Sequence, residues 1–202
     1  MIKYLLHFLL ILACVSGIGC TETATKLNEN ALLALNVENY DEAMTLLKRA
    51  ATLEPDNAET HFLLGLAYSG KGQYTETISE YKKALDLKPN DVPTMCWLAY
   101  TYLTKGMTDQ AITLSKKAIA LEPEAERCYY CLGIAYKKQG KHTIASRHLF
   151  EAGLLAFIKS KKNLAVQSYR ALQEIGPAQT TQELYELLEP FLTPDSKAVN
   201  PP

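Results

Sequence analysis

Apolar positions recur along most of the chain with the period of an α-helix, in pairs of segments separated by short polar turns. In the stretch "AETHFLLGLAYSG", His61, Gly65 and Tyr68 lie four and three residues apart, on one face of a helix. The turn "KGQY" follows, and a second helical stripe ends at Pro89, because proline removes a backbone donor and clashes with the preceding turn. The pattern predicts a helix-turn-helix unit over residues 58–91.

The same unit recurs every 34 residues. The stretches "KRAATLEPDN", "KKALDLKPND" and "KKAIALEPEA" begin at Lys48, Lys82 and Lys116, and each contains the proline that ends a block. The blocks cover residues 24–57, 58–91, 92–125 and 126–159. One helix pair cannot bury its own apolar face, so a stacked neighbour has to cover it. The period therefore predicts an all-helical solenoid of about four repeats.

Residues 160–192 continue the helical pattern without the period, and we expect them to form C-terminal capping helices. The first helix is predicted over residues 161–175, because Gly176 and Pro177 end its pattern. The apolar stripe of a shorter second helix consists of Leu184, Leu187, Leu188 and Phe191. Block four lacks the closing proline, so we expect its second helix to run on. Residues 193–202 are expected to be a disordered tail.

Certain residue types recur at fixed places in every block. In the second block they are Leu64, Gly65, Tyr68, Tyr74, Thr77, Tyr81, Ala84 and Pro89. This pattern resembles the tetratricopeptide repeat family over residues 24–159, and the first block departs from it at Asn30 and Ala34. The resemblance implies an all-α, right-handed superhelical solenoid. It also implies a non-catalytic scaffold that binds another protein on a concave face lined by the first helix of each block.

By the same resemblance, two places four residues apart on each first helix point into the groove, with a third about one turn further on. The residues predicted to line the groove are Phe62, Leu66, Ser69, Cys96, Tyr100, Leu103, Tyr130, Ile134 and Lys137. Some family members grip a carboxylate there with Lys, Arg and Asn, and that set is absent here. An apolar and aromatic wall suits an amphipathic or extended apolar segment. Two alternatives remain: a capping helix or the tail covers this face, or a second copy does so in a homo-oligomer.

The first twenty residues have the layout of an export signal. Residue Lys3 precedes an apolar run that is shorter than the about 20 residues needed to span a bilayer. The end of the run resembles a bacterial lipoprotein signal, with residues 1–19 removed and Cys20 lipidated, although Gly17 stands where that motif has a Leu-like residue. Cys14 is a second candidate. Residues 20–23 would form a short tether.

This resemblance implies a location in the cell envelope. Thr21 replaces the Asp that retains lipoproteins at the inner membrane of enteric bacteria, which favours the outer membrane, facing the periplasm. The overall layout is similar to that of tetratricopeptide lipoproteins that assist assembly of type IV pili. A cleaved signal would instead give a secreted or soluble periplasmic protein, and an uncleaved one an anchor.

The composition limits the remaining function classes. A formal net charge of -1 argues against a nucleic-acid partner, because neutralising phosphates needs a basic surplus. The sequence has neither a Gly-rich phosphate loop nor an H-E-x-x-H motif, and we expect no metal, no cofactor and no enzyme activity. His61 is expected to pack in the core, and Glu76 and Glu80 to lie one turn apart on an exposed face.

The motif "CYYC", from Cys128 to Cys131, is the sharpest local chemical feature. It falls in the first turn of a predicted helix, where the helix dipole can lower a thiol pKa. Three interpretations remain open: both residues pack as small apolar side chains, two of Cys96, Cys128 and Cys131 form a structural disulfide, or the pair is redox-active. The redox interpretation makes a thiol-disulfide protein the alternative to a scaffold.

Overall fold

The structure is a computed structural model that describes residues 23–176 and 179–189. These residues form helices and turns, with no strand among them. The described helices are α2 (Ala24–Asn36), α3 (Tyr40–Leu53), α4 (Ala58–Gly70), α5 (Tyr74–Leu87), α6 (Val92–Thr104), α7 (Thr108–Leu121), α8 (Glu126–Lys138), α9 (His142–Ile158), α10 (Lys162–Gln173) and α11 (Gln179–Leu188). The predictions for residues 1–22, Phe191 and the tail lie outside the described part of the chain.

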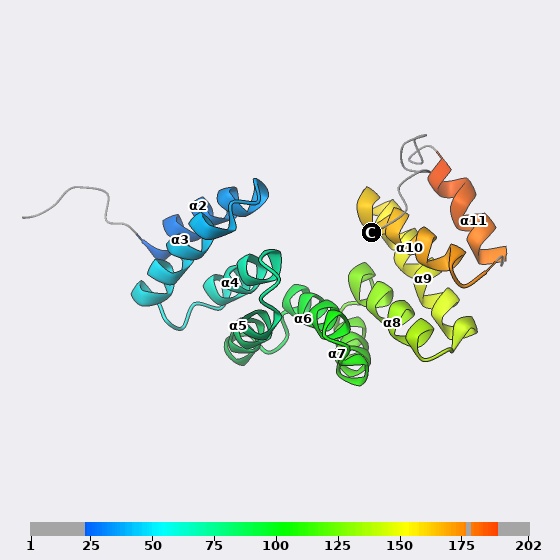
Figure 1. Ribbon diagram of the computed structural model, residues 1–202, viewed down its shortest axis with the longest axis horizontal. Helices are drawn as coiled ribbons and strands as arrows, with labels where there is room; N and C mark the ends of the chain where they lie inside the picture. Colours follow the sequence, from blue (N-terminus) through cyan, green and yellow to red (C-terminus); the bar gives the residue numbers. More distant parts are fainter. Residues whose placement is uncertain (1–22, 177–178, 190–202) are drawn as a thin grey trace, which may run out of the picture.

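The helices follow one another in a curved row (Figure 1). Each 34-residue block contains one antiparallel pair, and α2, α4, α6 and α8 lie toward the inner side of the arc in Figure 1. The prediction of an all-helical repeat solenoid is confirmed. Helix α9 has 17 residues, whereas α3, α5 and α7 have 14 each, so the second helix of block four does run on.

Helix boundaries are set by side-chain caps and by turn glycines. Asn57 and Asp91 begin α4 and α6 by accepting hydrogen bonds from the backbone N–H of the residue three positions on, at 3.1 Å in both cases. The turn between α4 and α5 passes through Gly72, whose φ of 70° costs a residue without Cβ little.

In blocks two and four the two helix backbones approach closely because a glycine faces a larger residue. The ring of Tyr81, which is fully buried, lies directly over Gly65: a Cβ added there would be 2.3 Å from the ring carbon Cε1. Gly133 faces Leu149 in the same way, with 2.5 Å to Cγ. These contacts leave no room for even one added methyl group.

Neighbouring blocks are joined by apolar packing and, at the first junction, by a buried polar pair. Leu63 and Ala67 of α4 pack into the core of block one. Asn28 donates a hydrogen bond from its amide to Thr60 Oγ1 at 2.9 Å, and the Thr60 hydroxyl donates back to Asn28 Oδ1 at 3.1 Å. Both side chains are buried and mutually satisfied, so block one is docked with a defined register.

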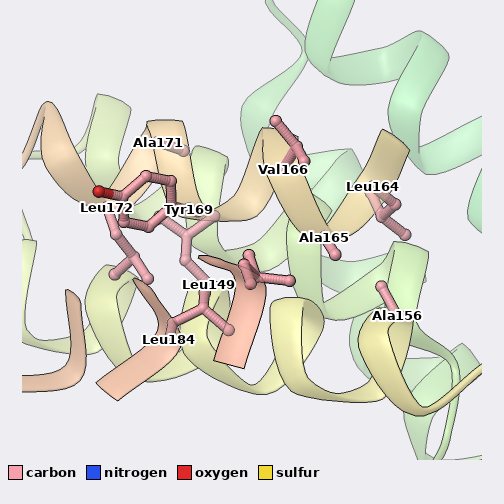
Figure 2. Close-up of a cluster of buried hydrophobic side chains, with 10 residues drawn as sticks. Leu149, Ala156, Leu164, Ala165, Val166, Tyr169, Ala171, Leu172 and Leu184 are labelled. Atoms are coloured by element: carbon pink, nitrogen blue, oxygen red, sulfur yellow. The ribbon is translucent and has the colours of Figure 1, made fainter. Parts of the chain in front are cut away.

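The C-terminal helices close the solenoid with a core of their own. Figure 2 shows Leu149 and Ala156 of α9 packed with residues of α10 and with Leu184 of α11. Close approach again depends on a glycine, since a Cβ on Gly153 would meet Leu184 at 2.5 Å. The capping prediction needs one correction: Leu187, assigned to the apolar stripe, is 38% exposed, because α11 turns Leu184 and Leu188 inward instead.

Replacing Gly65 with Ala tests the close helix contact. We expect G65A to lower the free energy of unfolding by about 1–3 kcal/mol, because the overpacking outweighs the better helix propensity of Ala. Thermal unfolding followed by circular dichroism measures the effect. Ser69→Ala on the same helix is the matched control and should change stability by less than about 0.5 kcal/mol. Equal stabilities of G65A and wild type would contradict the close contact.

Candidate protein-binding groove

The inner face of α4 carries Phe62 and Leu66, which are both half-buried. Their side chains contact the cores on either side of α4, and the Phe62 ring lies 5.9 Å from the ring of Tyr81. Ser69, one turn further on, is also half-buried. The core contacts fix these side chains in place, so the surface they leave exposed is preorganised.

The inner face of α6 is aromatic. Tyr100 is 38% exposed, and the half-buried Trp97 meets it edge-on, with 6.3 Å between ring centroids. The guanidinium of Arg127, from α8, lies over the Trp97 ring at 3.8 Å from its centroid. The sequence prediction missed Trp97 and Arg127, although the chain has a single tryptophan and Arg127 lies three residues before the predicted Tyr130.

Two residues predicted to line the groove contribute little surface. Cys96 and Leu103 are 5% and 4% exposed. Cys96 is turned toward α8 by its disulfide with Cys128, and Leu103 packs into the core between blocks two and four. The groove prediction is therefore corrected at these two positions.

The α8 end of the groove is partly covered by the cap. Tyr130 and Ile134 pack against the core formed by α9, α10 and α11, and burial raises the pKa of Tyr130 to about 12. Lys137 forms an ion pair with Glu174, at the end of α10. One of the alternatives, that a capping helix covers this face, thus holds for block four, whereas Tyr100 of block three is exposed.

Two clefts lie between successive first helices at equivalent places, one block apart. The first, of about 320 Å³, is lined by Ala58, Glu59, Phe62, Ala84, Lys88, Asp91, Pro93 and Thr94. The second, of about 210 Å³, is lined by Val92, Pro93, Cys96, Trp97, Glu122, Ala125, Glu126, Arg127, Lys159 and Lys161. We call them the α4–α6 cleft and the α6–α8 cleft. They differ in charge: the first has two carboxylates and one cation in its lining, whereas the second has two carboxylates and three cations.

The cysteines do not pair within "CYYC". The disulfide joins Cys96 of α6 to Cys128 of α8, with 5.1 Å between the Cα atoms. Cys131 is a buried free thiol, and burial raises its pKa to about 12 although Arg127 acts in the opposite direction. A thiol with this pKa stays protonated at neutral pH and is a poor nucleophile. Because Cys128 is bonded to Cys96, Cys128 and Cys131 do not form a redox pair in this structure.

His61 and Glu80 are engaged in structural contacts. His61 is buried, with Nδ1 2.7 Å from Glu80 Oε2 and Nε2 2.8 Å from the carbonyl oxygen of Pro55. Glu80, expected on an exposed face, therefore faces the interior of its block. In the part of the chain that the structure describes, no three His, Cys, Asp or Glu side chains are placed to hold a metal. None of the described helices has the length and apolarity that a membrane span needs.

A curved stack of helix pairs with a preorganised aromatic inner face defines an α-solenoid, a class of protein that binds partners along an extended concave surface. Family comparisons identify the repeat. The "TPR repeat" profile matches residues 38–72 and 99–140, and two "Tetratricopeptide repeat" profiles match residues 58–91 and 80–113. The protein is therefore a tetratricopeptide-repeat solenoid. Domains of this kind bind other proteins or peptides and are generally non-catalytic scaffolds.

Solved structures with the same fold come from several bacteria. MamA (41-end) from Desulfovibrio magneticus RS-1 superposes with a TM-score of 0.67 at 21% identity, covering 86% of this chain and 97% of that one. PilF of Pseudomonas aeruginosa superposes with a TM-score of 0.59 at 19% identity, with 87% of each chain covered. A thermophilic TPR protein of Thermus thermophilus superposes with a TM-score of 0.59 at 18% identity, covering 83% of this chain and 100% of that one. At these identities the likeness concerns the fold alone. No curated protein matches the sequence.

The disulfide can be tested through its effect on stability. We expect dithiothreitol to lower the free energy of unfolding by about 2–4 kcal/mol, because reduction frees a long loop in the unfolded chain. Denaturant unfolding of the oxidised and reduced protein measures this. Cys128→Ala should abolish the sensitivity to reductant, and Cys131→Ala should retain it. Retained sensitivity in Cys128→Ala would place the disulfide elsewhere.

Proposed function

We propose that this protein is a non-catalytic scaffold of the bacterial envelope that holds an apolar or amphipathic segment of a partner protein in its concave groove and thereby assists assembly of an envelope complex. The observation that carries the proposal is the aromatic inner face around Tyr100. A tyrosine that is 38% exposed, braced edge-on by Trp97, offers a large rigid contact area. Aromatic anchors of this kind have few rotors to immobilise on binding.

The segment would follow the inner face from α4 to α6. Phe62 and Leu66 supply a half-buried apolar wall at one end, and the α4–α6 cleft beside Phe62 can accept a side chain. The covered Tyr130 and Ile134 make the α8 end less accessible. Binding would therefore centre on blocks two and three.

The envelope location rests on two sequence features and one structural one. Cys20 after an export signal would carry the lipid, and Thr21 favours the outer membrane. A disulfide such as Cys96–Cys128 persists in oxidising compartments, which include the bacterial periplasm. The proposed role in assembly comes from the resemblance of the sequence layout to tetratricopeptide lipoproteins that assist assembly of type IV pili. The likeness to PilF of Pseudomonas aeruginosa adds only the shared fold.

If the partner binds in the groove, substitution of Tyr100 should weaken partner binding. We expect Tyr100→Glu to lower recovery of partner from solubilised native envelopes at least tenfold in quantitative affinity capture, because a carboxylate in an apolar contact is costly to desolvate. Leu87→Glu is the matched control: Leu87 is 40% exposed but lies at the end of α5 and lines neither cleft. Equal recovery with both variants would contradict the groove. Light scattering of the purified protein distinguishes partner binding from self-association: a monomer in the absence of partner would show that a second copy does not occupy the groove.

Lipidation predicts a change in fractionation. We expect the full-length protein to partition with membranes and Cys20→Ala to become soluble and to lack the acyl mass, because a lipid chain, and not a protein span, holds the wild type. Ultracentrifugation of lysates and intact-mass spectrometry measure the two effects. Cys14→Ala serves as the control and should behave as wild type. Unchanged fractionation of Cys20→Ala would overturn the anchor.

A further inference from the structure

Charge is distributed unevenly along the solenoid. Residues 23–91 contain seven Lys and Arg against eleven Asp and Glu, a net charge of -4. Residues 126–176 contain nine against three, a net charge of +6. The near-neutral total conceals a basic C-terminal part, and the α6–α8 cleft lies where that part begins.

Most cations around this cleft are compensated by carboxylates. Glu126, only 8% exposed in its side chain, forms ion pairs with Lys161 and, at 3.3 Å, with Lys159. Burial alone would raise the pKa of Glu126, but the hydrogen bonds and charges of these lysines hold it below its usual value. Glu126 is therefore ionised at neutral pH and engaged with both lysines.

Arg127 differs from these lysines. It lines the same cleft and is half-buried, and its Cζ lies over the face of Trp97, 3.8 Å from the ring centroid. Among the described residues, no carboxylate forms an ion pair with it. A guanidinium that lies over an aromatic face can still use the N–H groups at its edge to bind a carboxylate through two parallel hydrogen bonds.

We propose that the α6–α8 cleft binds an Asp or Glu side chain of the partner segment through Arg127, while apolar or aromatic neighbours of that acid pack on Trp97 and Tyr100. The inference rests on the proposed function and names the chemistry of the partner: an acidic, aromatic-containing protein segment. Counting Glu122 and Glu126 against the three cations leaves the cleft lining with a net charge of +1. This charge matches one carboxylate.

A random-peptide phage library, selected against the full chain in detergent, provides the test. We expect selected peptides to contain Asp or Glu within a few residues of an aromatic residue. Measured by fluorescence anisotropy, Arg127→Glu should weaken binding of the best peptide about tenfold or more, since a charge-assisted pair is replaced by a repulsion. A peptide whose acidic residue is replaced with Lys should bind the Arg127→Glu variant but should no longer bind the wild-type protein. Arg147→Glu, the same charge change on an exposed part of α9, should leave the affinity unchanged.

The outcomes separate this inference from the proposed function. Peptides without acids that bind wild type and Arg127→Glu equally, and are lost with Tyr100→Glu, would overturn the acidic-partner inference and leave the groove standing. Peptide binding that is unchanged in Tyr100→Glu and in Arg127→Glu would overturn both the acidic-partner inference and the proposed groove. Arg127-dependent binding to phosphatidylglycerol vesicles, with no peptide selected, would assign the cleft to a lipid surface and overturn the inference.

Discussion

The architecture depends on the distance at which the two helices of each block cross. The first helix of each block carries a side chain no larger than Ala at the same place, at Ala31, Gly65, Ala99 and Gly133. Over Gly65 and Gly133 the facing residue of the second helix, Tyr81 or Leu149, fills the remaining space. Because the crossing recurs every 34 residues, each pair leaves the same apolar flank for the next one. The curvature that turns the first helices inward, and thus the groove itself, follows from this repeated geometry (Figure 1).

The facing residues also explain why the blocks are not interchangeable. The large ring of Tyr81 lies over a glycine, whereas the equivalent place in the next block is occupied by the small side chain of Ser115. Both polar side chains are fully buried, and neither Tyr81 Oη nor Ser115 Oγ has a hydrogen-bond partner in the described structure. Burial raises the pKa of Tyr81 well above its ordinary value, so its hydroxyl stays neutral. Each block thus fulfils the common geometry with a different local packing.

Periodicity made the repeat region predictable, because the helix pairs and turns of residues 24–159 are specified by short-range patterns that recur every 34 residues. The groove was predictable only as far as a helix position determines which way a side chain points. Phe62 and Tyr100 follow that rule, but Cys96 and Leu103 are buried by contacts with another block. The disulfide partner of Cys128 lies 32 residues away, a relation that no local motif encodes, whereas "CYYC" suggested a pair with Cys131, which remains a free thiol. Stacking of Arg127 on Trp97 is likewise a contact between blocks.

The Cys96–Cys128 bond has a mechanical consequence. A solenoid behaves as a spring whose compliance resides at the junctions between units, since each unit touches only its neighbours. The covalent bond connects two first helices on the inner side of the arc, so it limits how far that junction can open. Among the described residues, the junction between blocks one and two has no covalent link: it is held by a hydrogen-bonded pair, by apolar packing and by the ion pair of Lys71 with Asp41. Elastic strain imposed by a bulky ligand would therefore be taken up at the N-terminal end, while the spacing between Tyr100 and Arg127 stays fixed.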